Sequence, residues 1–124
     1  MLAPMHSDKT IVRKLLLKPG AALALVNAPA GHAQPEGTVE AKPAAADAVL
    51  LFANDAETLV AKLPALDEAL RDEARLWIAY PKAGQLGTDL DRDAVRAQLE
   101  PAGWNPVRQV ALDDTWSALW FKRA

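Results

Sequence analysis

The sequence predicts an α/β domain in which an open, mostly parallel sheet carries helices on both faces and ends in an antiparallel hairpin. Short apolar runs of strand length alternate with segments of helical periodicity. Three turn-forming residues separate the last two strand-like runs, and no internal repeat competes with this pattern. A chain of 124 residues has the size of one domain with one core, which we place at residues 11–124.

The N-terminal part of the chain is expected to hold a short helix and a first strand. Residues 1–10 mix proline, histidine and charge without periodicity, so we expect a flexible N-terminus. Apolar residues recur at helical spacing over 11–16 and predict a helix that the Pro-Gly pair at 19–20 stops. The run 21–26 is almost wholly apolar, as in a strand covered on both faces.

A long connection leads to the second buried strand. Residues 27–46 are rich in Ala, Pro and Gly and contain one brief possible strand at 38–40. Such a segment is long enough for one crossover between parallel strands but too short for two regular helices and two more strands. Residues 48–53 form the next apolar run, and Asn54 or Asp55 is a suitable N-cap for a helix after it.

The next helix carries one apolar stripe and one flaw. The stripe consists of leucines spaced four, three and four apart, namely Leu59, Leu63, Leu66 and Leu70. Pro64 lacks an N–H and clashes with the carbonyl four residues back, so we expect a kink or break near residues 62–63. A bulky, partly aromatic strand follows at 75–80 and ends at Pro81.

The C-terminal third is expected to contain a helix and a hairpin. Thr88 and Asp91 have the spacing of a capping box, and the helix they begin continues to a Pro-Ala-Gly sequence. The more polar run 107–112 predicts an edge strand, and 116–121 predicts a strand with apolar cover on both faces. Residues 113–115 form the tight turn between them.

Charge and cysteine content exclude several kinds of partner and chemistry. The net charge is −2 with acids and bases interspersed, so no basic field exists for nucleic acid or an anionic membrane. The absence of cysteine excludes disulfides and thiolate sites. His6 and His32 lie far apart without paired carboxylates, so we expect no metal.

The sequence predicts a cytoplasmic protein. No apolar run approaches the roughly 20 residues that cross a bilayer. Arg13-Lys14 and the apolar residues after them faintly resemble a signal peptide, but Lys18-Pro19-Gly20 cuts that run in two. Nothing in the sequence indicates an oligomeric state.

Ligands of open α/β sheets bind beyond the carboxyl ends of the strands, and this rule selects a candidate ligand-binding edge. Its members follow or join the predicted strands: Asn27, Asn54, Lys82, Thr88, Asp89, Asp113, Asp114 and Trp116. The hairpin residues belong to this edge only if the strand entering the hairpin runs parallel to the others. A lysine facing carboxylates suits a zwitterion, an anionic small molecule or proton transfer.

Structural roles compete with these functional ones. Thr88 and Asp91 serve equally well as helix caps, Asp113 and Asp114 as turn residues, and Lys82 as a solvated or salt-bridged charge.

His32 is either a general base or a solvated loop histidine. We expect Trp77 and Trp120 in the core. One of Trp104 and Trp116 is expected to be partly exposed, where it would contact a partner.

Several segments carry a resemblance to a known fold. They are Leu17-Lys18-Pro19-Gly20, Arg75-Leu76-Trp77-Ile78-Ala79-Tyr80-Pro81-Lys82 and the closing hairpin. Together they resemble the class I S-adenosylmethionine-dependent methyltransferase fold, a Rossmann-like sheet whose last strand inserts antiparallel beside the fifth. The sequence more closely resembles a family of small uncharacterised bacterial domains that have a trimmed version of this fold. This resemblance covers roughly residues 15–123. That similarity lies in Ala79-Tyr80-Pro81-Lys82, Thr88-Asp89-Leu90, Arg92-Asp93 and Asp113-Asp114-Thr115-Trp116-Ser117-Ala118-Leu119.

The methyltransferase resemblance implies a cofactor site from which this sequence departs. Methyltransferases cradle S-adenosylmethionine on a glycine-rich turn after the first strand and bind its ribose with an acid after the second. Here the turn, residues 27–31, has one glycine, and Pro29 removes an amide donor. Glu40 is the one candidate ribose partner. We therefore expect no cofactor.

Three functions remain open. The first is a non-catalytic module that binds a small molecule or a protein partner on a degenerate methyltransferase-like scaffold. The second is a small enzyme that uses Lys82 with Asp89 or Asp114. The third is a true S-adenosylmethionine-dependent methyltransferase, and the fold alone does not choose among them.

Overall fold

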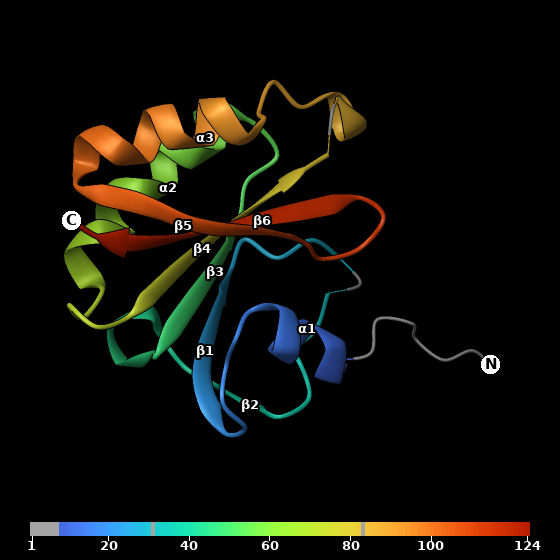
Figure 1. The fold of residues 1–124 in the computed structure, drawn as a ribbon, viewed down its shortest axis with the longest axis vertical. Coiled ribbons are helices and arrows are strands. Elements are labelled where there is room, and N and C mark those ends of the chain that lie inside the picture. Colours follow the sequence, from blue (N-terminus) through green and yellow to red (C-terminus); the bar gives the residue numbers. More distant parts are fainter. Residues whose placement is uncertain (1–7, 31, 83) are drawn as a thin grey trace.

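A computed structural model describes residues 8–30, 32–82 and 84–124, which form one six-stranded sheet in the order β2-β1-β3-β4-β6-β5 (Figure 1). The strands are β1 (Ala21–Val26), β2 (Thr38–Glu40), β3 (Ala48–Phe52), β4 (Arg75–Pro81), β5 (Trp104–Ala111) and β6 (Trp116–Arg123). β2, β1, β3 and β4 pair in parallel, whereas β6 lies antiparallel between β4 and β5. The predicted fold class is confirmed.

Helices cover both faces of the sheet (Figure 1). α2 (Ala56–Ala69) and α3 (Arg92–Leu99) lie on one face, and α1 (Asp8–Lys14) lies on the other. Short 3₁₀ turns complete the connections: η1 (Pro43–Ala45), η2 (Gln85–Gly87) and η3 (Glu100–Ala102).

α1 begins and ends earlier than the sequence predicts. Residues 8–10 belong to the helix, and the expectation of a flexible N-terminus otherwise falls on residues 1–7, outside the described residues. The helix ends before the Pro-Gly pair because Leu16 adopts a left-handed conformation with φ of 58°. The Leu17 amide then donates to the Val12 carbonyl at 3.1 Å, a bond typical of helix C-termini.

The strands alternate their side chains between two apolar layers. Leu51 and Ile78 face α2 and α3, where Leu59 and Leu99 cover them. The neighbouring residues Leu50 and Trp77 face α1. Because successive side chains of a strand point to opposite faces, wholly apolar strands such as β3 need cover on both sides.

Pro64 does not break α2, so of the expected kink or break the break does not occur. The helix runs without interruption from Ala56 to Ala69, although Pro64 lies inside it. Pro64 and Val60, the residue four positions before it, are both exposed, so water can bind the Val60 carbonyl that the proline leaves without a partner. Leu59 and Leu63 on the opposite side are buried against the sheet and maintain the helix.

The predicted capping box at α3 is also wrong. Asp91 is the N-cap itself, and its carboxylate accepts a hydrogen bond from the Ala94 amide at 2.8 Å. The Thr88 hydroxyl instead accepts from the Leu90 amide at 3.0 Å. Thr88 therefore forms a local turn before the helix, which begins at Arg92. At α2, Asp55 rather than Asn54 is the N-cap.

Some tryptophans are more buried than the sequence predicts, and one is less buried. Trp104 and Trp116 are both buried, at 0% and 4% exposure, so the predicted exposure of one of them is wrong. The Trp104 indole donates to Asp67 at 3.0 Å, and Arg123 covers its ring. Trp77 is buried as predicted, but Trp120 is only half-buried and stacks on Trp77 with ring centroids 5.9 Å apart.

Candidate functional site

The carboxyl ends of the parallel strands meet at one edge of the sheet, as the sequence predicts. β5 pairs antiparallel with β6, which itself pairs antiparallel with β4, so β5 runs in the direction of β4. The hairpin turn at 113–115 therefore lies at the carboxyl edge. The topological switch point falls between β1 and β3, because the chain passes from β1 to β2 on one side and then to β3 on the other.

Asn27 bridges the two strands that flank the switch point. It follows β1 with φ of 59°, a left-handed conformation that asparagine tolerates better than most residues. Its side-chain amide donates to the Phe52 carbonyl at the end of β3, at 2.8 Å. The amide group therefore spans the carboxyl ends of β1 and β3.

His32 lies over the end of β3. Its Nε2 is 3.3 Å from Asp113 Oδ2, and both side chains are 17% exposed. The imidazole ring packs on Phe52 with centroids 5.0 Å apart, and Phe52 in turn meets Trp116 edge to face at 5.1 Å. His32 is thus part of a packed cluster with the hairpin, which sequence spacing alone did not place beside it.

Asp113 holds the hairpin turn together while it pairs with His32. Its Oδ1 accepts hydrogen bonds from the Thr115 and Trp116 amides, both at 2.8 Å. Because one oxygen bonds the turn and the other faces the imidazole, this carboxylate joins the hairpin to the β1–β2 connection. The turn role expected for Asp113 is present, and the contact with His32 adds to it.

Asp89 and Asn54 lie near the N-terminus of α2. Asp89 accepts a hydrogen bond from the Ala56 amide at 2.9 Å, while Asp55 accepts from the Thr58 amide at 2.8 Å. The latter bond is the main reason why the pKa of Asp55 is lowered. Asn54 is exposed beside them. Two carboxylates therefore satisfy amides that would otherwise bind an anion here.

Lys82 and Asp114 lie near the hairpin but do not form a pair. The Lys82 amide donates to the Thr115 carbonyl at 2.7 Å, and the Gln85 side chain donates to the Asp114 carbonyl at 3.2 Å. Across the described part of the chain, no ion pair joins Lys82 to a carboxylate. The structure thus does not bring Lys82 together with Asp89 or Asp114.

A hollow of about 390 Å³ lies beside the end of β4, on the α3 side of the sheet. Its lining comes from β4, α3 with its N-cap, β5 and β6: Tyr80, Asp91, Arg92, Asp93, Gln109 and Ser117. None of these six belongs to the predicted ligand-binding edge. A serine within the apolar run 116–121 was the available signal, because a hydroxyl in a buried strand needs a partner.

Another hollow, of about 450 Å³, lies at the opposite, amino edge of the sheet. Two of its charged residues pair with each other, since Arg71 donates to Asp47 at 2.8 Å. A hydrogen bond from the Ala22 amide to Asp47 is the main cause of the lowered pKa of this carboxyl, and Arg71 lowers it further. We therefore regard these residues as structural.

The residues after β1 do not fit the cofactor that this fold implies. In methyltransferases a helix N-terminus follows the first strand and faces the cofactor. Here the described residues between β1 and β2, 27–30 and 32–37, contain no helix, and Pro29 supplies no amide. Glu40 does end β2 as an exposed acid, but it pairs in register with Leu23, four residues before Asn27. The Asn27 side chain spans the switch point itself.

The described residues offer neither a metal-binding cluster nor a membrane-spanning helix. They contain no group of three or more metal-ligating side chains that would hold an ion. They also contain no helix that is both long and apolar enough to cross a membrane.

The fold is Rossmann-like and is similar to that of several solved methyltransferase structures. A tRNA methyltransferase, TrmK of B. subtilis, superposes with a TM-score of 0.62 at 12% identity, over all of this chain and 68% of that one. Magnesium protoporphyrin IX methyltransferase from Synechocystis, solved with bound S-adenosylmethionine, gives 0.61 at 11% identity, over 95% of this chain and 78% of that one.

A third structure, ribosomal protein L11 methylase from Lactobacillus delbrueckii subsp. bulgaricus, gives a TM-score of 0.58 at 13% identity. The match covers 94% of this chain and 76% of that one. No family model and no curated protein matches the sequence. At these identities the likeness establishes a trimmed methyltransferase-like fold and leaves the activity open.

Proposed function

We propose that this chain is a non-catalytic module that binds a small ligand on a methyltransferase-like scaffold, and that its methyl-donor site is occupied by its own side chains. One observation carries the proposal. At the switch point, where ligands of open α/β sheets bind, the Asn27 amide bonds the Phe52 carbonyl. His32 lies over the same residue and contacts Asp113.

A cofactor at this position would have to displace those contacts. Removing Asn27 from Phe52 exposes a carbonyl at the end of a buried strand, and removing His32 separates a ring from Phe52 and a nitrogen from Asp113. Each lost hydrogen bond costs about 0.5–1.5 kcal/mol, or more when a partner is left buried. The proline-containing turn supplies fewer amides in return. These costs favour a scaffold that has lost the donor site.

The enzyme reading has weaker support. Asp89 is engaged with the Ala56 amide, and Lys82 has no carboxylate partner within the described part of the chain. The pair that does resemble a catalytic dyad, His32 with Asp113, is packed against Phe52 and the hairpin. We interpret this pair as a structural contact that joins the β1–β2 connection to the hairpin turn.

A small ligand is favoured over a protein partner. Large apolar side chains that are exposed among the described residues lie on separate elements: Leu16, Val39, Val60, Leu86 and Val107. Protein interfaces instead gather such side chains into one patch. Polar hollows such as the one beside Tyr80 suit a small molecule better.

The test is binding of S-adenosylmethionine and of its demethylated product, measured by calorimetry and by thermal unfolding of the full chain. A ligand at 100 times its Kd stabilises a protein by about 2.7 kcal/mol. We expect neither compound to bind at the switch point, where binding would move the amide resonances of Asn27 and Phe52 in the ¹⁵N-labelled chain. A methyltransferase measured in parallel is the positive control. Saturable 1:1 binding of either compound that moves the Asn27 and Phe52 amides would overturn the proposal.

A further inference from the structure

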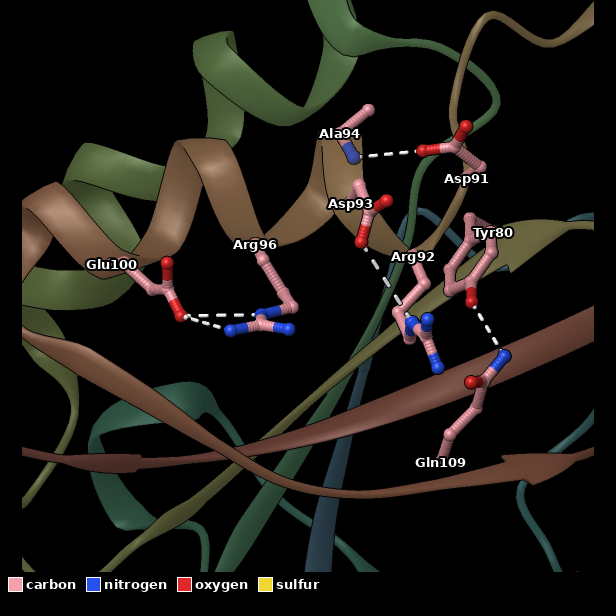
Figure 2. A network of polar contacts seen from close by, with 8 residues as sticks. All are labelled: Tyr80, Asp91, Arg92, Asp93, Ala94, Arg96, Glu100 and Gln109. Carbon is pink, nitrogen blue, oxygen red and sulfur yellow. Dashed lines mark hydrogen bonds and ion pairs between the residues drawn. The ribbon is translucent and has the colours of Figure 1, made fainter.

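The hollow beside Tyr80 gathers hydrogen-bonding groups from separate parts of the chain (Figure 2). Tyr80 and Ser117 are direct partners in the β4–β6 ladder, so their side chains share one face of the sheet. Gln109 reaches them from β5, and its amide donates to the Tyr80 hydroxyl at 2.8 Å. Arg92, the first residue of α3, extends toward the same two side chains in Figure 2.

Ser117 contributes to this hollow a hydroxyl that is unpaired among the described residues. It is the one polar residue among the buried residues described, with 8% exposure, and it lines the hollow. Its hydroxyl makes no hydrogen bond to any described residue, and its oxygen is open to the hollow rather than enclosed by protein. This hydroxyl is therefore available to water or to a solute in the hollow.

Two more donors point to a negatively charged group. The Tyr80 hydroxyl accepts from Gln109, so its own proton remains available to a third group. Arg92 is paired only loosely, with Nε 3.8 Å from Asp93 Oδ1, a distance longer than a hydrogen bond. A hydroxyl from Tyr80, a hydroxyl from Ser117 and a guanidinium together match the oxygens of a carboxylate.

Two acids restrict what that carboxylate is attached to. Asp91 caps α3 with one oxygen, while Asp93 stands 83% exposed at the rim of the hollow. One guanidinium against two carboxylates leaves the lining with a net negative charge, which disfavours a phosphate dianion. A ligand that carries a positive group as well as a carboxylate is complementary both to the guanidinium and to the acidic side chains of the lining.

The pKa of Tyr80 supports the close approach of these charges. Burial is the main cause that raises the pKa of the Tyr80 hydroxyl, Arg92 lowers it, and Asp91 and Asp93 raise it again. All three charged side chains therefore act on the hydroxyl that faces the hollow.

We propose that this hollow binds the zwitterionic head group of a free amino acid. The carboxylate is bound by Arg92 and by the Tyr80 and Ser117 hydroxyls, and the ammonium group is bound by Asp93. This inference rests on the proposed function, a non-catalytic module for small ligands, and names its ligand class. A volume of about 390 Å³ is within the range of small-molecule sites.

The test is a titration of the ¹⁵N-labelled full chain with the twenty standard amino acids, one at a time, followed by amide chemical shifts. We expect at least one to move the amides of Arg92 and Ser117 saturably, with Kd at or below about 1 mM. Two analogues of the best binder follow. Its carboxamide lacks the carboxylate, and its 2-hydroxy acid lacks the ammonium group. Each is expected to bind about tenfold or more weakly.

Matched variants locate the site. Arg92→Gln, at an exposed position, is expected to weaken binding about tenfold, and Ser117→Ala is expected to weaken it severalfold. Arg96→Gln is the control, because Arg96 pairs with Glu100 farther along the same helix (Figure 2). The pocket proposal is overturned if no amino acid moves these amides, if either analogue or inorganic phosphate binds equally well, or if Arg92→Gln binds like the unaltered chain.

The outcomes separate the two proposals. Failure of every amino acid, with no binding of S-adenosylmethionine, removes the zwitterion site and leaves the non-catalytic module standing. S-adenosylmethionine itself carries an amino acid head group, so its binding removes the proposed function only if it moves the amides of Asn27 and Phe52 at the switch point. Binding that moves only the amides of Arg92 and Ser117 supports the zwitterion site.

Discussion

Tyr80 is the single tyrosine of the chain, so the absorbance of its phenolate reports this one residue. Burial raises the pKa of its hydroxyl above the ordinary value of about 10. A raised pKa makes the folded state bind its proton more tightly than the unfolded state, so this contribution to stability is complete below pH 10 and lost as pH rises past it. We expect phenolate absorbance to appear at higher pH in the folded chain than in urea.

Arg92→Gln provides the control for this titration. The guanidinium lowers the pKa of Tyr80, so its removal is expected to delay phenolate formation further, whereas Arg96→Gln is expected to leave it unchanged. Phenolate that forms at the same pH in folded and unfolded chains would contradict the burial of this hydroxyl.

Single residues of the candidate site were predictable only where the chemistry is local. Asp113 makes the turn that its sequence position indicates, because its carboxylate bonds amides two and three residues ahead. Its pairing with His32, far away in the sequence, depends on how the β1–β2 connection folds over the sheet. Arg92 and Gln109 also lie beside Tyr80 only because the strands and α3 pack together. The spacing of residues in the sequence does not predict this packing.

Among the elements, α2 tests how a helix tolerates an internal proline. Pro64 is exposed, and its ring removes a hydrogen bond on the solvent side of a helix anchored by Leu63 and Leu66. Pro64→Ala restores that bond and relieves the clash with the preceding turn. We expect it to stabilise the chain by about 1–3 kcal/mol, measured by urea unfolding.

Val60→Ala is the matched control for Pro64→Ala. Val60 lies one turn earlier in α2 and is 50% exposed, so its truncation is expected to change stability by less than about 0.5 kcal/mol. A loss of stability in Pro64→Ala would mean that the proline makes packing contacts of its own or restrains the unfolded chain more than it strains the helix.

Strands were easier to predict than helix ends. The apolar run 21–26 is β1 as observed, because a strand buried in a parallel sheet is marked by composition alone. At α3, Thr88 and Asp91 are both good capping residues, and only the fold decides which of them bonds the first turn. β5 begins at Trp104, earlier than residue 107, since Pro106 lies in an edge strand where its missing amide is tolerated.

On the scale of the whole molecule, the two faces of the sheet are covered unequally (Figure 1). α2 and α3 together cover one face, whereas α1, with seven residues, provides the helical cover of the other. The same weakly covered face contains Phe52 and Trp116, which support His32 at the carboxyl edge. The packing of α1 and the geometry of the switch point are therefore parts of one apolar layer.

Leu15→Ala tests this coupling. Leu15 follows α1 directly, is fully buried and packs in the layer that contains Phe52 and Trp116. Its truncation is expected to cost about 2–5 kcal/mol in urea unfolding, a large part of the 5–15 kcal/mol that typically stabilises a domain. The near-ultraviolet circular dichroism of the folded variant is also expected to weaken, because Trp116 loses packing on this face.

Leu16→Ala separates this effect from damage to the end of α1. Leu16 is adjacent, 40% exposed and left-handed in φ, and alanine is no better suited to that conformation than leucine. We therefore expect a change of less than about 1 kcal/mol and an unaltered aromatic spectrum. Equal losses in the two variants would mean that the backbone turn, rather than the Leu15 side chain, holds α1 on the sheet. In that case the apolar layer beneath His32 would depend on the left-handed turn at Leu16, which positions α1, rather than on the packing of Leu15.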